Sequence, residues 1–158
     1  MNLRKLHSKM SSLSVQLNEV HNSIEKSEMA MFSMICEWQV KANETYPSFK
    51  LVNNPKCSYY ENGWVNRDTD ELVIDYDTEA DWESGRTDTL VIPMSAVDKD
   101  IKGVKEWFDG KLAEYAAKNN ARIEAAKKRN ADKEKKEKER RRALYEQLKK
   151  EFELEDEK

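Results

Sequence analysis

The feature that most constrains this chain is a row of apolar residues spaced alternately three and four apart over residues 3–38. This heptad spacing places them on one narrow stripe of an α-helix, a pattern typical of coiled coils. A helix of a globular core buries a wider face. Ser27 is the one polar residue in the row. We call its ten apolar residues the seam: Leu3, Leu6, Met10, Leu13, Leu17, Val20, Ile24, Met31, Met34 and Trp38.

The seam predicts a helix over residues 2–45, which ends at Tyr46-Pro47 because proline disfavours helix in the residue before it. A stripe this narrow has to be covered, and we expect a second copy of the chain to cover it in a homodimer or higher oligomer. The alternative is an antiparallel hairpin with the chain's own C-terminal helix. We prefer self-association, because the polar middle of that helix has no apolar face to offer.

Residues 46–97 predict a small antiparallel β core. In Leu72–Asp77 and in Thr89–Met94 the even positions are apolar, and a period of two indicates half-buried strands. Leu72, Ile74 and Tyr76 are expected to face Leu90, Ile92 and Met94. Phe49–Val52 and Cys57–Val65 are further strand candidates, with Asn62-Gly63 as a turn or bulge. Pro93 indicates an edge strand or a strand end.

Residues 98–153 predict a second long helix, capped by Ser95 or Asp98. Its first turns carry an apolar stripe that includes Val104 and Phe108, whereas Gly103 and Gly110 weaken it. From residue 118 the helix is rich in Lys, Arg and Glu. The predicted fold class is therefore α+β: a long N-terminal coiled-coil-like helix, a small antiparallel sheet with a hairpin, and a long charged C-terminal helix.

The net charge of −3 conceals a division into an acidic part, residues 1–117, a basic part, residues 118–150, and an acidic end. Such segmentation bears on partners more than on the fold. The densest acidic segment is the predicted hairpin between Asp68 and Asp88, where we expect a protein partner to bind. The candidate residues for this contact are Asp75, Asp77, Glu79, Asp81, Trp82 and Glu83.

Other interpretations of the acidic hairpin stay open. A calcium loop of the EF-hand type needs Gly at its sixth position and Glu at its twelfth, and the chain has Ala80 and Arg86 there. Carboxylates spaced along a strand can mimic nucleic-acid phosphates. They can also be a solvated face that prevents edge-to-edge aggregation. Trp82 is either an interface anchor or a cover over the sheet.

A second charged feature is the basic stretch of residues 127–142. Lysine and arginine clusters bind phosphates, so contact with nucleic acid is possible here. Interleaved acidic residues and the lack of an aromatic for base stacking favour a solvated helix instead. The candidate nucleic-acid contacts are Lys135, Lys136, Lys138, Arg140, Arg141 and Arg142.

The sequence contains no motif of an enzyme: it has no glycine-rich phosphate loop, nucleophile elbow or His-Glu-x-x-His. Cys36 and Cys57 lack the spacing of a zinc site or a disulfide framework. We expect no catalytic residue, no bound metal and no cofactor. The chain shows neither a signal peptide nor an apolar run of membrane-spanning length, which predicts a soluble cytoplasmic protein without a membrane partner.

The chain is short and charge-dense and lacks an enzyme motif, and a Trp- and Asp-rich hairpin precedes a long Lys/Glu helix. In this general character it resembles the small accessory proteins of bacteriophages. The resemblance implies a protein that acts by binding, in the host cytoplasm if phage-encoded. Our leading hypothesis is a non-enzymatic, oligomeric protein–protein interaction protein, such as an inhibitor or modulator of a host protein. The alternatives are a nucleic-acid-binding protein and a structural or scaffold coiled coil.

Overall fold

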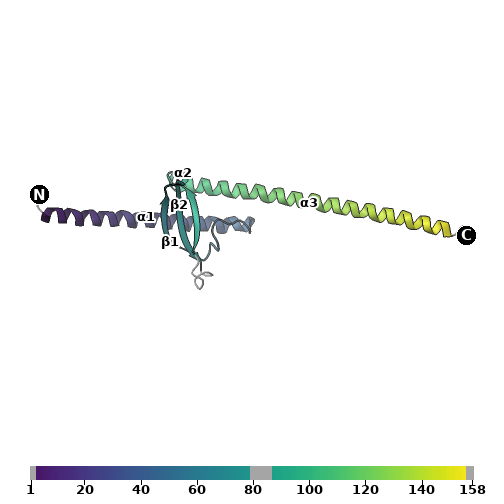
Figure 1. Ribbon diagram of the computed structural model, residues 1–158, viewed down its shortest axis with the longest axis horizontal. Helices are drawn as coiled ribbons and strands as arrows, with labels where there is room; N and C mark the ends of the chain where they lie inside the picture. The colour runs from purple at the N-terminus through teal and green to yellow at the C-terminus, as the bar shows by residue number, and fades with distance from the viewer. Residues whose placement is uncertain (1–2, 79–86, 156–158) are drawn as a thin grey trace. The chain divides into compact units, whose positions relative to one another are not determined.

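The computed structural model describes residues 3–78 and 87–155 and confirms the predicted α+β fold (Figure 1). The chain forms two compact units, Met1–Ala113 and Glu114–Lys158, and the last helix crosses the boundary between them. The elements in chain order are α1 (Leu3–Thr45), β1 (Ser58–Asn66), β2 (Glu71–Thr78), β3 (Asp88–Pro93), α2 (Met94–Val97) and α3 (Asp100–Glu155).

The helix α1 packs on the sheet with its C-terminal half only (Figure 1). Its buried residues recur at intervals of three and four, so they form one face that begins at residue 28. Two of them are polar, which is uncommon for a helix face in a core. The buried residues of α1 are Glu28, Phe32, Ile35, Cys36 and Gln39.

The sheet has the antiparallel order β1-β2-β3. Leu72 pairs with Ile92 and Ile74 with Leu90, so the two strongly alternating strands pair with each other as predicted. Met94, expected to continue the apolar face of the second strand, begins α2 instead. The four paired side chains and Tyr76 are buried, and the Tyr76 ring lies 5.1 Å from that of Phe32 on α1. One face of the sheet and one face of α1 therefore form the core. As predicted, β3 is an edge strand that ends at Pro93.

The predicted strand at Phe49–Val52 is wrong, because its backbone pairs with a side chain and not with another strand. Within α1, the amide of Gln39 is fully buried; its Oε1 accepts hydrogen bonds from the backbone N–H of Leu51 at 2.7 Å and of Val52 at 2.8 Å. Its Nε2 donates to the Val52 carbonyl at 2.6 Å. One glutamine thus replaces a strand partner, while Phe49 and Val52 bury their side chains.

The predicted cap of the second long helix is also wrong. Ser95 lies inside the short helix α2, Asp98 follows the end of that helix, and α3 begins at Asp100 with a positive φ of 57°. The turn draws the backbone so close that a Cβ on Gly103 would lie 2.3 Å from the Ala96 carbonyl oxygen. Gly103 is therefore required for close packing, whereas Gly110 faces open space.

Candidate functional site

The N-terminal half of α1 is exposed, although it carries most of the predicted seam. Every residue from Leu3 to Ser27 is exposed except Leu6, which is half-buried. Leu6 apart, the exposed fractions of the apolar side chains in this half of α1 run from 51% at Ile24 to 73% at Leu3. Apolar side chains are ordinarily scattered singly on a surface, so a continuous row calls for a partner. We call this row the exposed seam: Leu3, Leu6, Met10, Leu13, Leu17, Val20 and Ile24.

The last three residues of the predicted seam lie against the chain's own fold. Met31, Met34 and Trp38 are half-buried. The Trp38 ring meets that of Phe108 on α3 edge to face at 5.6 Å, and Phe108 itself is buried. The seam therefore divides near Ser27 into an exposed part and a part used within the protein.

A small apolar hollow of about 270 Å³ lies at this division. It opens between the α1 face that continues the exposed seam and the edge of the body formed by β1, β2 and α2. Ser27, the polar residue of the heptad row, contributes to its wall. The apolar residues that line the hollow are Ile24, Met31, Val65, Leu72, Met94 and Val97.

Glu28 fixes α1 to the sheet beside the hollow. Its carboxylate accepts a hydrogen bond of 2.7 Å from the Tyr60 hydroxyl, and only 9% of the residue is exposed. Burial, followed by this bond to Glu28, raises the pKa of Tyr60 well above its ordinary value, so the phenol stays a donor. A Cβ on Gly63 would lie 2.5 Å from the Glu28 carboxylate. Gly63 therefore makes the room in which the carboxylate lies.

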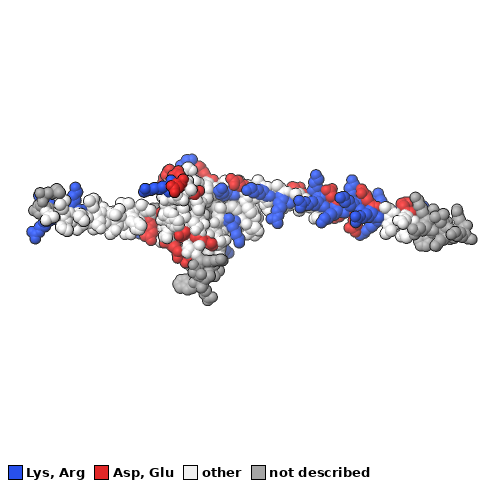
Figure 2. Space-filling view, in the orientation of Figure 1, with Lys and Arg blue, Asp and Glu red and all other residues white. Residues whose placement is uncertain are grey.

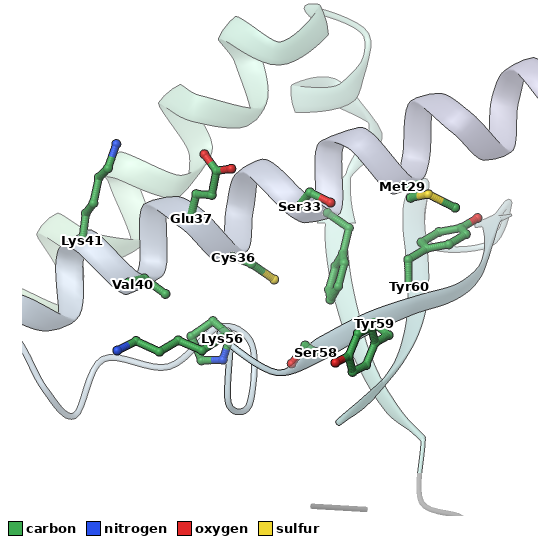
Figure 3. Close-up of a pocket in the computed structure, with 12 residues that line it drawn as sticks. Met29, Ser33, Cys36, Glu37, Val40, Lys41, Lys56, Ser58, Tyr59 and Tyr60 are labelled. Carbon is green, nitrogen blue, oxygen red and sulfur yellow. The ribbon is translucent and has the colours of Figure 1, made fainter. Parts of the chain in front are cut away.

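A larger groove of about 750 Å³, which the sequence did not reveal, lies between α1 and the start of β1 (Figure 3). Cys36 and Val40 point from α1 toward Lys56 and Ser58 on the opposite wall. Burial raises the pKa of the Cys36 thiol to about 11, so at neutral pH it is a thiol and serves as apolar wall. No sequence signal links the two walls, because they come from separate segments.

The acidic hairpin is described only in part. Asp75 and Asp77 are half-buried on β2, and Glu79, Asp81, Trp82 and Glu83 lie outside the described residues. The structure adds Glu61, at a bulge in β1 between Tyr60 and Asn62. A hydrogen bond with Asp77, followed by burial and the charges of Asp77 and Asp75, raises the pKa of Glu61. This side of the sheet therefore concentrates negative charge. Whether a protein binds it stays a prediction.

The basic stretch forms an exposed part of α3, and Figure 2 shows acidic side chains interleaved with the basic ones. Arg141 pairs with Glu137 one turn away, and Lys127 pairs with Glu124 at 2.8 Å. Exposed pairs of this kind support the helix by a few tenths of a kcal/mol each. The six candidate nucleic-acid contacts, Lys135, Lys136, Lys138, Arg140, Arg141 and Arg142, are all exposed along this helix. Nucleic-acid binding stays a prediction.

No protein-family model, curated protein sequence or solved structure matches this chain. Within residues 3–78 and 87–155, no helix offers an apolar stretch sufficient to cross a bilayer. In the same ranges, no three His, Cys, Asp or Glu side chains gather as ligands for a metal ion.

Proposed function

We propose that this chain is a self-associating protein-interaction protein, and that its exposed seam pairs with the exposed seam of another copy. The observation that carries the proposal is the heptad row from Leu3 to Ile24, which lies on a helix and is exposed at six of its seven positions. In water such a row is stabilised by a second helix that covers it.

The rest of the described chain offers no equivalent cover. From Lys118 to Arg142, α3 is exposed at every position except Asn119, and its apolar residues there are alanines and Ile123. This composition provides no complementary heptad row. A second copy of α1, in contrast, brings the same Leu, Met, Val and Ile spacing.

The magnitude of the apolar burial supports pairing. Burying a Leu, Met, Val or Ile side chain completely contributes about 1.5–3 kcal/mol, and all exposed seam residues except Leu6 start half to three-quarters exposed. Two helices together gain on the order of 15 kcal/mol. Association costs roughly 4–15 kcal/mol, so burial of the exposed seam offsets a cost anywhere in this range.

A set of three variants tests the proposal by solution mass. Leu13→Asp and Leu17→Asp each place a carboxylate in the seam, where burial without a partner is costly. Val15→Asp is the matched control, because Val15 is 57% exposed but lies off the seam. We expect the two seam variants to have the monomer mass of 18.6 kDa while Val15→Asp assembles as the unaltered chain does. Equal masses for all three variants would refute seam-driven assembly.

Circular dichroism separates loss of assembly from loss of the fold. The hydrogen bonds of an α-helix are internal to it, and Leu13 and Leu17 lie outside the compact core. The seam variants should therefore keep the near-ultraviolet signal of the core aromatics, such as Tyr76 and Phe108. A variant that loses this signal has unfolded, and its mass then says nothing for the proposal.

A further inference from the structure

We infer that the two copies pair antiparallel, so that the partner's Leu3 closes the hollow beside Ser27. This inference rests on the proposed function and adds the direction and register of the helices. It also gives the hollow a role as the place where the partner's Leu3 binds. In a single copy the apolar lining of the hollow is open to solvent.

The body of the protein restricts the direction of a second helix. Val65, Leu72 and Met94 lie beside Met31 at the hollow, and Phe108 contacts Trp38 further on. A partner helix that lies along the exposed seam therefore has to end near Ser27. A parallel partner cannot end there, because its own α1 continues without a break to Thr45. An antiparallel partner ends at this point, because it arrives with its N-terminus.

The heptad pattern selects one register for the antiparallel pair. A heptad has two apolar positions, a and d. In an antiparallel pair, each residue at position a lies beside a residue at position d of the partner helix. In the register that uses the whole exposed seam, Leu13 lies beside the partner's Leu17. Met10 then lies beside the partner's Val20, and Leu6 beside the partner's Ile24. Ser27 lies beside the partner's Leu3, so an apolar side chain reaches the hollow where the chain's own row has a small polar residue.

Charge supports the same direction. The free end of α1 carries Arg4, Lys5 and Lys9, and its first acidic residue is Glu19. At the other end of the exposed seam, α1 carries Glu19 and Glu25 against one basic residue, Lys26. The turn between Val65 and Leu72 adds Asp68, Asp70 and Glu71 against one basic residue, Arg67. An antiparallel pair places each basic end on the partner's acidic end, whereas a parallel pair would place the basic ends together.

Disulfide trapping tests the direction in the full chain. Cys36→Ala and Cys57→Ser first remove the two native thiols, and the solution mass of this background is measured. Leu3→Cys and Ser27→Cys are then introduced into separate chains, one with a tag that changes its size. The two variants are mixed, allowed to exchange, oxidised mildly and separated without reductant. Val15→Cys serves as the control for random collision, because Val15 lies off the seam.

We expect the disulfide between the Leu3→Cys chain and the Ser27→Cys chain to dominate over either same-variant disulfide and over the Val15→Cys control. Same-variant disulfides in excess, formed by a dimer of 37.2 kDa, twice the chain mass, would overturn the antiparallel arrangement and leave the proposed function intact. A background protein of 18.6 kDa with an intact fold would instead refute the proposed function itself.

Discussion

Gln39 provides a sharp test of the core, because one buried side chain satisfies three backbone groups. Gln39→Leu keeps roughly the size of the side chain but leaves the N–H groups of Leu51 and Val52 and the Val52 carbonyl without partners. Each buried polar group left unpaired costs about 1–3 kcal/mol. Since Leu51 is only partly buried, we expect a total loss of about 3–5 kcal/mol in the free energy of unfolding.

The loss is measured by urea denaturation at one protein concentration, with tryptophan fluorescence as the signal. The midpoint should fall while the slope stays constant, which indicates a change of stability and not of the unfolded state. The same substitution at exposed Gln147 is the control. A Gln39→Leu protein within about 1 kcal/mol of the unaltered chain would refute the role assigned to Gln39.

Gln39→Glu separates hydrogen bonding from packing. A carboxylate still accepts from Leu51 and Val52, but it faces the Val52 carbonyl, to which Nε2 donates at 2.6 Å in the unaltered chain. Protonation at acidic pH restores a donor. The stability of Gln39→Glu relative to the unaltered chain should therefore rise on acidification, whereas the deficit of Gln39→Leu should not change.

Two further predictions concern glycine and acidic positions. Gly110→Ala should stabilise the protein by about 1 kcal/mol through helix propensity. Gly103→Ala should lower the melting temperature, because its Cβ meets the Ala96 carbonyl. Equal effects of the two substitutions would contradict the close packing at Gly103. Because the folded state raises the pKa of Glu61 above 4.5, its protonated form supports the fold below about pH 4.5, and this support is lost as the pH rises through the folded-state value. Glu61→Gln should therefore raise the melting temperature at pH 7 and lose that advantage in acid. Glu106→Gln is the control, because Glu106 is likewise exposed and lies on α3, away from Asp77. A gain that is independent of pH would contradict the link to Asp77.

The fold was largely predictable because its elements carry strong periodic signals. The alternation in Leu72–Asp77 and Thr89–Met94 determines which residues face the core, and the observed register follows it. The strand predicted at Phe49–Val52 is wrong, because an apolar run can be buried equally well as a strand or as an irregular segment. Here the segment is irregular and its backbone bonds to the distant amide of Gln39. Residues thirteen positions apart in sequence give no local sign of such a bond.

The functional surfaces were predictable only in part. The spacing of the exposed seam is visible in the sequence, but the point at which α1 enters the core is not. There the buried face includes Glu28 and Gln39, whose polarity hides it from a count of apolar residues. Heptad spacing therefore predicts that Met31, Met34 and Trp38 belong to the seam, whereas in the structure they are half-buried. The hollow and the groove each join segments distant in sequence, so spacing alone does not reveal them.

The mass of the unaltered chain in solution, measured by sedimentation equilibrium over a range of concentrations, tests the central claim most directly. If helices pair through the row from Leu3 to Ile24, the mass rises with concentration from 18.6 kDa toward 37.2 kDa, twice the chain mass, or a higher multiple. A folded chain that stays at 18.6 kDa at every concentration would contradict the account.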